Sequence, residues 1–407
     1  MNKTNTHRLP SGLKIIHEAS PTGVVYCGFL LRAGTRHERA DEPGMAHFCE
    51  HMTFKGTVRR RSTHIINGME RVGGDLNAYT NKDETVYYAT AMKEDFTRAA
   101  DLLSDIVFHS TYPLREIGRE AEIIADEIDS YKDSPADLIY DEFESMLFAG
   151  HPLGRDILGN ADVLRTFTTD HFTRFRDAHY MPANATFFVY GDLPFSRIVK
   201  TIERTTAGVF PSFTPSPIQP LPPYAATRRE VAKDTHQAHV MIGNRTFPAT
   251  DERYPALFLL NNILGGPGMN SKLNVALRER AGLVYNVDSN LNHYTDTGVW
   301  SVYFGCDKAD VKRCLRIAGG VLSRLAEQPL SPSALQAAIK QVIGQVRIAA
   351  DNFESYAIGM AKTYAHHDRP RDIADFCHRL SLITPTALQS VAAELFAPEK
   401  RSVLVYG

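Results

Sequence analysis

The chain has 407 residues, of which 43% are apolar and 23% charged, and this composition is that of a folded globular protein rather than a disordered one. The formal net charge is −2, so the sequence lacks the basic excess of a dedicated nucleic-acid-binding protein. The longest apolar stretches fall well short of the ~18 residues that a membrane span requires.

The five cysteines form no C-x-x-C pair, and the N-terminal residues lack the apolar core of a secretory signal. An odd number of scattered thiols argues against a disulfide framework. We therefore expect a cytoplasmic protein, with no nucleic acid and no membrane span, unless a targeting segment has been removed.

The first informative elements are an apolar strand over Val24–Leu31 and a helix over 41–56, which reads DEPGMAHFCEHMTFKG. Asp41 is expected to cap this helix, Pro43 suits its first turn, and Gly56 suits its C-terminal end.

The predicted helix places two histidines on one face. His47 and His51 are at positions i and i+4 and can converge on a metal, and Glu50 shares their side of the helix. Cys49 points away and is no sensible ligand. The pattern H-x-x-E-H is the inverted form of the zincin motif, although a histidine pair at this spacing can also be a buried or capping pair.

A catalytic zinc needs a third protein ligand, and the next helix, over 113–131, offers carboxylates. Glu116, Glu120 and Glu127 lie along one edge of its apolar stripe. Glu120 and Glu127 are about 10 Å apart along the helix axis, so only one of them can bind the ion. The other would orient a ligand or steer charge near the site. Periodicity does not choose between them, and such an acidic edge can also be simply solvated.

The middle of the chain is marked by six prolines within 211–223, which predict a stiff connector. We expect an N-terminal domain over 1–210, a linker over 211–227 and a C-terminal domain over 228–407. The segment 168–191 aligns without gaps with 384–407, and Pro113-Leu114 matches Pro329-Leu330 at the same offset. Matches at one constant offset indicate that the two domains are homologous.

Short strand-like runs alternate with long amphipathic stretches in both halves, among them Thr85–Met92, Phe187–Tyr190 and Val299–Phe304. This order predicts an α+β fold in which each domain is a mainly antiparallel sheet covered by helices. The strand order does not follow from the sequence. The second half lacks H-x-x-E-H, and its corresponding helix is apolar, so we expect one metal site per chain.

With these motifs the chain resembles the pitrilysin-type inverzincin peptidases, in particular the mitochondrial and bacterial processing-peptidase branch. The third zinc ligand of that family is a glutamate at about the spacing that separates Glu127 from His51. The resemblance implies His47, His51 and Glu127 as ligands of one Zn²⁺ per chain. It also implies Glu50 as general base and Glu120 as a carboxylate supporting the ligands.

The resemblance extends to residues that would bind substrate. Asn77 and Ala78, in GGDLNAYTNKDETVYY, match the edge strand on which family members hold the substrate backbone, although Asn-Ala can also be a plain turn. Arg278 and Tyr285, in LRERAGLVY, match the pair that contacts the substrate carbonyl and the tetrahedral oxyanion.

The function implied is that of a zinc-dependent endopeptidase that hydrolyses unfolded peptides or short polypeptides inside a closed chamber. Family members enclose peptides with four such domains, so a two-domain chain is expected to form a clamshell homodimer in which another subunit contributes the Arg/Tyr pair. Two alternatives remain: a non-catalytic family subunit that binds or scaffolds a peptidase partner, and a metal-stabilised peptide-binding module.

Overall fold

The computed structural model describes residues 4–209 and 218–407, and the chain divides into two compact units. Unit 1 takes in the described residues of Met1–Asp129, Arg155–Gln219 and Ala349–Arg371, and unit 2 those of Ser130–Gly154, Pro220–Ile348 and Asp372–Gly407. Pro211, Pro215 and Pro217 of the predicted linker lie outside the described residues. The remainder of the linker, 218–227, contains no helix or strand.

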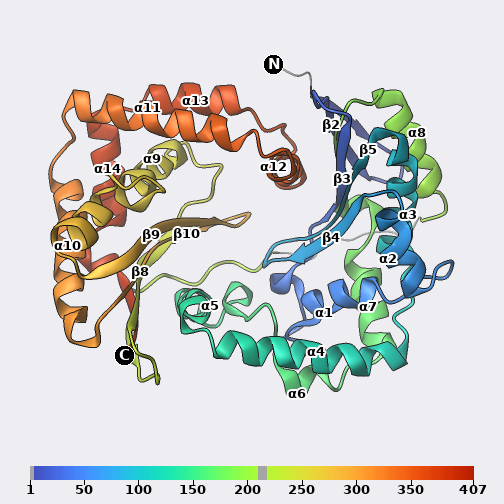
Figure 1. Cartoon of the computed structure of the whole chain (residues 1–407), viewed down its shortest axis with the longest axis horizontal. Helices are drawn as coiled ribbons and strands as arrows, with labels where there is room; N and C mark the ends of the chain where they lie inside the picture. The colour runs from blue at the N-terminus through green and yellow to red at the C-terminus, as the bar shows by residue number, and fades with distance from the viewer. Residues whose placement is uncertain (1–3, 210–217) are drawn as a thin grey trace. The chain divides into compact units, whose positions relative to one another are not determined.

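The described part of unit 1 is built on a six-stranded sheet with the order β1-β2-β6-β3-β5-β4. Figure 1 labels four of these strands, β2, β3, β4 and β5. Its strands are β1 (Asn5–Arg8), β2 (Lys14–Glu18), β3 (Val24–Leu31), β4 (Asp75–Thr80), β5 (Thr85–Met92) and β6 (Ala185–Tyr190). All neighbours are antiparallel except β2 and β6, which run parallel. The strands predicted at 24–31 and 85–92 have the predicted bounds.

Both faces of this sheet are covered, because alternate residues of its central strands are apolar on either side. One face packs on the helices α1 (Met45–Thr53), α2 (Ser62–Glu70), α3 (Phe96–His109), α4 (Leu114–Lys132), α7 (Thr169–His179) and α8 (Phe195–Thr205). The other face, with Leu30, Val86 and Phe188, packs on α12 (Phe353–His367). Helix α12 thus comes from the second half of the sequence.

Unit 2 repeats this plan. Its described strands are β7 (Arg228–Val231), β8 (Ala238–Thr246), β9 (Val284–His293), β10 (Gly298–Cys306) and β11 (Ser402–Tyr406), in the order β7-β11-β8-β10-β9. Only β7 and β11 are parallel among these neighbours. Strand β11 corresponds to β6 in the alignment of the two halves, and the order reproduces β2-β6-β3-β5-β4 of unit 1, as expected of a duplicated fold.

The helices of unit 2 also lie on both faces of its sheet. One face, with Trp300 and Phe304, packs on α9 (Tyr254–Gly265), α10 (Val311–Glu327), α11 (Pro332–Ala349), α13 (Ile373–Ser381) and α14 (Pro385–Leu395). The other face, with Met241 and Leu404, packs on α5 (Pro135–Leu147), which comes from the first half. The two halves have therefore exchanged one helix each.

The fold is thus α+β with two mixed, mainly antiparallel sheets covered by helices, as predicted. Continuous domains over 1–210 and 228–407 were expected, whereas each compact unit is discontinuous in sequence. The reason is physical: α5 and α12 each cover an apolar sheet face of the other half of the sequence, which that half leaves bare. None of the described helices is both long and apolar enough to cross a bilayer.

Candidate metal centre

Helix α1 carries the H-x-x-E-H residues, but it begins later than predicted. Asp41 is not its N-cap, because the helix starts at Met45 after Gly44, whose φ of 87° is left-handed. Asp41 instead accepts a hydrogen bond from Arg39 at the surface. The helix ends at Thr53, before Gly56 is reached.

The two histidines of α1 lie side by side as predicted. The ring centroids of His47 and His51 are 4.6 Å apart. Cys49 is buried on the other side of the helix, where its thiol donates to the hydroxyl of Tyr112 at 3.6 Å. Only the histidine face of α1 is therefore directed toward the candidate centre.

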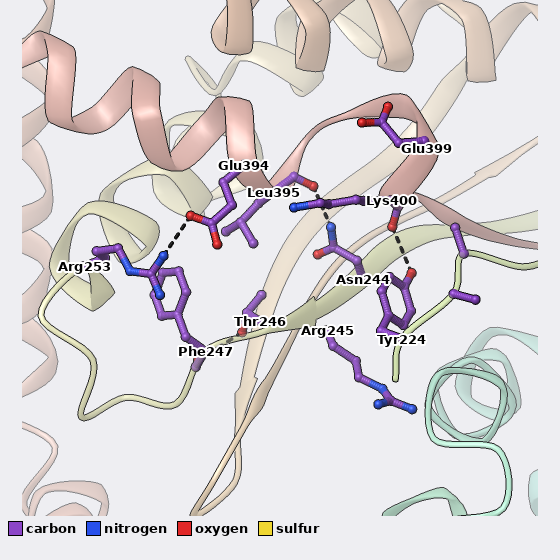
Figure 2. Close-up of a pocket in the computed structure, with 12 residues that line it drawn as sticks. Tyr224, Asn244, Arg245, Thr246, Phe247, Arg253, Glu394, Leu395, Glu399 and Lys400 are labelled. Carbon is purple, nitrogen blue, oxygen red and sulfur yellow. Dashed lines mark hydrogen bonds and ion pairs between the residues drawn. The ribbon is translucent and has the colours of Figure 1, made fainter. Parts of the chain in front are cut away.

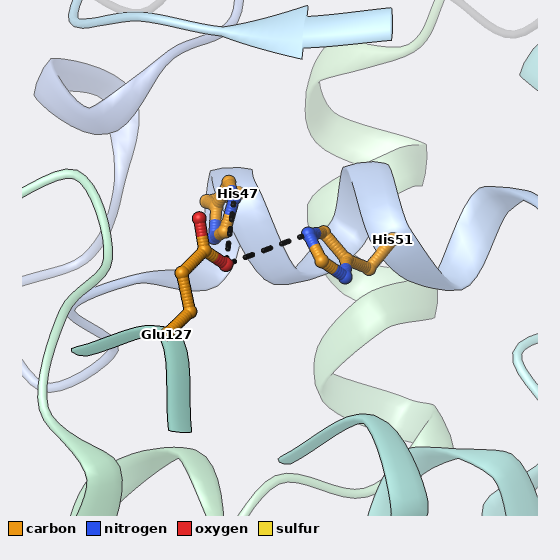
Figure 3. Close-up of side chains that lie close together, drawn as sticks. All are labelled: His47, His51 and Glu127. Carbon is orange, nitrogen blue, oxygen red and sulfur yellow. Dashed lines mark ion pairs between the residues drawn. The ribbon is translucent and has the colours of Figure 1, made fainter. Parts of the chain in front are cut away.

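Glu127 of α4 approaches both histidines (Figure 3). Its Oε2 atom lies 3.9 Å from His47 Nε2 and 4.0 Å from His51 Nε2. Donor atoms of the three residues all lie within 4.8 Å of one another, the arrangement expected of a candidate metal site. The geometry thus brings Glu127, rather than Glu120, between the two imidazoles.

This donor set fits a catalytic zinc ion. Such sites use three protein ligands and leave a position for water, and tetrahedral bonds of about 2.0–2.2 Å separate ligand atoms by roughly 3.3 Å. The observed separations of 3.9 and 4.0 Å need only a small inward movement. Burial, followed by the charge of His51, lowers the pKa of His47 to about 3, so its imidazole is held in the neutral form that binds metals.

Glu120 contacts the ring nitrogen of His51 that does not face Glu127. Its Oε2 atom lies 3.2 Å from His51 Nδ1, and its Oε1 atom lies 2.5 Å from Lys55 Nζ. Burial opposes ionisation of Glu120, but the hydrogen bonds from His51 and Lys55 keep its pKa below the usual value. Carboxylates that hold the second ring nitrogen of a ligating histidine fix its tautomer and orientation.

Glu50 projects from the same helix without joining the three-residue cluster. Burial raises the pKa of its carboxyl, a hydrogen bond from Thr80 opposes that shift, and the charge of Glu127 adds to it. Within the described structure its Oε2 atom is buried and has no hydrogen-bond partner. A partly desolvated carboxylate in this place is suited to accept a proton.

Asn77 and Ala78 lie on β4, at the edge of the unit 1 sheet. Within the described sheet β4 pairs with β5 alone, and α1 packs against it. Asn77 is exposed, and its side chain accepts a hydrogen bond from the amide of Ala78. The edge strand expected from the sequence is therefore present beside the metal helix, while its role as a peptide binder stays a prediction.

Arg278 and Tyr285 belong to unit 2. Arg278 lies in a π-helical segment, Asn274–Arg280, and Tyr285 lies on the edge strand β9. The guanidinium lies over the tyrosine ring at 5.5 Å from its centroid, and Tyr285 is 84% exposed. The two side chains are thus brought together, and their role in catalysis stays a prediction.

Sequence reasoning missed two neighbours of the centre, Lys55 and Thr80. Lys55 could have been found because it follows His51 at the i+4 spacing and so continues the histidine face beyond the end of α1. No local pattern pointed to Thr80, whose contact with Glu50 depends on how β4 packs against α1.

Unit 2 contains a separate pocket of about 400 Å³ at the end of β8 (Figure 2). Its arginines are already engaged: Arg253 pairs with Glu394 at 2.7 Å, and Arg245 donates to the carbonyls of Leu147 and Pro222. No histidine or cysteine is among the residues that line it. Among the described residues, the only group of three or more metal-binding side chains is that of unit 1.

Comparisons with known proteins agree with the geometry. Residues 14–161 match the family described as insulinase (peptidase family M16), and residues 166–342 match the peptidase M16 inactive domain. An uncharacterized zinc protease of Streptomyces coelicolor is 30% identical over 400 residues, covering 95% of this chain and 86% of the relative. Another, from Bacillus subtilis, is 28% identical over 396 residues, covering 97% and 96%.

Solved structures share the fold at lower identity. A crystal structure of the peptidase M16 inactive domain from Pseudomonas fluorescens superimposes with a TM-score of 0.91 at 19% identity, covering 100% of this chain and 98% of that one. A protease from Helicobacter pylori gives 0.90 at 21% identity, with 100% and 99% covered.

Proposed function

Because this chain belongs to the insulinase family of peptidases, M16, we propose that it is a zinc-dependent endopeptidase acting on unfolded peptides. The observation that carries the proposal is the cluster of His47, His51 and Glu127, whose donor atoms lie within 4.8 Å of one another. Glu50 lies on the same helix as the two histidines but does not belong to the cluster. Three ligands plus one nearby base are the parts that metal-assisted peptide hydrolysis needs.

His47, His51 and Glu127 would hold the zinc ion, and Glu120 would orient His51. When bound, zinc supplies Lewis acidity, which polarises a peptide carbonyl and lowers the pKa of water. Glu50 takes the proton from the attacking water and returns it to the leaving amine. Burial of Glu50 raises its pKa, which suits a group that must carry a proton between two steps.

The peptide would bind in extended form along β4. An edge strand offers unpaired backbone groups, so a substrate can add to the sheet as a further strand, with Asn77 and Ala78 beside it. Such binding reads the backbone and requires an unfolded segment. This mode favours unfolded peptides over folded proteins as substrates.

Arg278 and Tyr285 would donate hydrogen bonds to the substrate carbonyl and the developing oxyanion. One such donor contributes about 3 kcal/mol to transition-state stabilisation. On the family resemblance we propose that two chains form a homodimer around a closed chamber, and that the pair acts on peptide held at the zinc centre of the other subunit.

The test combines zinc content, mass in solution and hydrolysis of a quenched peptide on the same preparation. We expect about one zinc per chain, a dimer, and loss of hydrolysis on chelation. Glu127→Gln should lose both zinc and hydrolysis. Glu122→Gln is the matched control, because Glu122 lies on the same helix but pairs with Arg165 at the surface, at 2.9 Å.

Other outcomes would point elsewhere. Zinc loss in Glu120→Gln with retention in Glu127→Gln would overturn the ligand assignment. A chain that binds peptide but neither binds zinc nor hydrolyses would be a non-catalytic family subunit. A chain that binds zinc and peptide without hydrolysis would be a metal-stabilised binding module.

A further inference from the structure

The N-terminus of α1 is held by a residue that lies outside the helix. We propose that Glu38 is a positioning residue of the metal centre: its carboxylate clamps the first turn of α1 and thereby fixes His47 and His51 relative to Glu127. The inference rests on the proposed function, since it takes these three residues to be the zinc ligands.

The clamp uses both carboxylate oxygens. The amide of Gly44 donates to Glu38 Oε2 at 3.1 Å, and the amide of Ala46 donates to Oε1 at 2.9 Å. Glu38 is only 6% exposed. Two hydrogen bonds from separate backbone positions to one rigid group restrain both the rotation and the translation of the helix end.

The helix has no cap of its own. Its N-cap is Gly44, which has no side chain, and a Cβ built there would lie 2.6 Å from the carbonyl oxygen of Leu158. A capping side chain at this position is therefore sterically excluded. The first amides of a helix need partners and prefer an anion, so Glu38 supplies from a distance what the N-cap residue cannot.

Glu38 is itself firmly placed. Arg155 donates to its carbonyl oxygen at 2.6 Å. Just before it in the sequence, Arg36 forms a buried ion pair with Asp83 at 2.8 Å, in the turn between β4 and β5. Through Glu38 and the neighbouring Arg36, helix α1 is therefore linked to the turn that follows the edge strand β4.

The geometry around Glu38 favours its ionised form, whereas burial favours its neutral form. Burial raises the pKa of Glu38 to about 8, while the amides of Ala46 and Gly44 and the charge of Arg155 oppose that shift. Both oxygens accept N–H groups, and the ionised carboxyl satisfies this arrangement fully. In the ionised form of Glu38 these bonds are charge-assisted and about twice as strong as neutral ones.

A loose clamp would disturb the centre directly, because His47 follows Ala46 in sequence. Side-chain tips lie about 6 Å from a helix axis, so a rotation of about 10° displaces them by about 1 Å. Metal sites tolerate much less than this without loss of affinity. Glu38 touches neither zinc nor substrate, so it would act only through the helix.

The test compares two buried glutamates of unit 1 that each accept two hydrogen bonds. Glu38→Gln places an NH₂ group against one of the α1 amides. Glu18→Gln is the matched control, because Glu18 is 4% exposed and accepts from Thr4 and Tyr356, both at 2.7 Å, and neither residue belongs to α1. The first readout is the rate at which zinc passes from the folded protein to a chromophoric chelator, below the unfolding temperature of each variant.

We expect Glu38→Gln to release zinc about 10- to 100-fold faster than wild type, in the range seen for residues that support ligands. Its kcat should fall while KM changes little. Glu18→Gln should lower thermal stability without changing zinc release. If Glu38→Gln fails to fold, Glu38→Asp, which retains both oxygens on a shorter side chain, should give an intermediate release rate.

The inference is overturned if Glu38→Gln releases zinc within twofold of wild type, or if Glu18→Gln accelerates release equally. A wild-type protein that binds zinc but cleaves no peptide would overturn the proposed function alone, because zinc release still reports on Glu38. A wild-type protein that binds no zinc would overturn both.

Discussion

The two units share the same arrangement of strands and helices and differ in the side chains that their helices carry. Each has the same order of five strands, one parallel pair, and helices on both sheet faces. In unit 1 the first long helix carries His47, Glu50 and His51, whereas in unit 2 the corresponding helix α9 is mostly apolar and has Leu257, Leu259 and Leu260 buried. Duplication therefore preserved the sheet and its packing, while the chemistry resides in a few side chains of one copy.

The two units also differ in the residues that hold the metal-binding helix α1 and its histidines in place. The cap supplied by Glu38 and the contacts of Glu120 with His51 and Lys55 all belong to unit 1. In unit 2 the exposed pair Arg278 and Tyr285 is the feature with a proposed role. If this division is right, loss of metal binding should be confined to variants of unit 1, and variants of Arg278 and Tyr285 should affect turnover alone.

The largest effect is expected for Glu50→Gln. Loss of the general base should reduce hydrolysis of a quenched peptide by about 10²- to 10⁴-fold. Zinc content should stay at the wild-type value, because Glu50 is not a ligand in the proposed site. Near-normal turnover in this variant would rule out the mechanism and with it the functional distinction between the units.

The second prediction concerns the double variant Arg278→Ala, Tyr285→Phe. Because one oxyanion donor contributes about 3 kcal/mol, hydrolysis should fall at least about 10²-fold while zinc content is unchanged. Mixed with Glu50→Gln, the double variant should regain activity. Random exchange makes about half of the dimers mixed, each with one intact site of two, so recovery should approach a quarter of wild type.

Activity that stays absent in mass-verified mixed dimers would mean that the pair does not complement the zinc centre of another subunit. Zinc loss in the double variant would contradict the separation between the units more directly. Measuring zinc on each homodimer before mixing distinguishes these two results.

A smaller effect is expected for Glu120→Gln. The hydrogen bond between His51 Nδ1 and Glu120 fixes the orientation of a proposed ligand, so zinc affinity should fall about 10- to 100-fold. Glu116→Gln is the control, because Glu116 lies on the same edge of α4 and pairs with Arg119, at 3.3 Å, instead of a histidine. Competition with a chelator measures the zinc affinity of both variants. Equal zinc affinities of Glu120→Gln and Glu116→Gln would contradict the supporting role of Glu120.

The last prediction concerns the acid stability of the zinc-free protein. In unit 1, burial lowers the pKa of both His37 and His179 from 6.5 to about 4; His37 also faces His179, Asp83 and Arg36. The unfolded chain binds protons near pH 6.5 but the folded unit does not, so stability is lost as the pH falls from 6.5 to 4. Each shift corresponds to at most about 3 kcal/mol.

Among the described residues of unit 2, one histidine has such a pKa: His293, which burial also lowers to about 4. Hydrogen exchange followed by mass spectrometry at pH 7 and pH 5 should therefore show a larger loss of protection in the strands of unit 1. Equal loss in both units would indicate that the buried histidines do not govern acid stability. The Glu18→Gln variant serves as a reference for a change in unit 1 that leaves these histidines in place.

Local patterns predicted much of the fold. The strands over 24–31 and 85–92 have the predicted bounds, and α4, at Leu114–Lys132, nearly coincides with the helix expected at 113–131. These segments were predictable because alternation and helical periodicity reflect burial of one side of each element. The constant offset between matching segments of the two halves likewise predicted the repeated sheet.

Other features depend on packing between distant segments. Periodicity left Glu120 and Glu127 as equal candidates and the family resemblance favoured Glu127, but only the approach of α4 to α1 shows which of them lies near both histidines. The prediction that Asp41 caps the helix was wrong. The amides at the start of α1 donate instead to Glu38, which the preceding loop brings against the helix. The exchange of α5 and α12 was not predictable, because an amphipathic helix does not encode which sheet it covers.

That exchange has a consequence for biosynthesis. Strand β6, which completes the unit 1 sheet, ends at Tyr190, but α12 begins only at Phe353. At about 5–20 residues per second, the ribosome needs roughly 8–30 s to make the intervening stretch. During that time the sheet face with Leu30, Val86 and Phe188 has no helix to cover it. The nascent chain should therefore depend on chaperones longer than a protein whose domains close in sequence order.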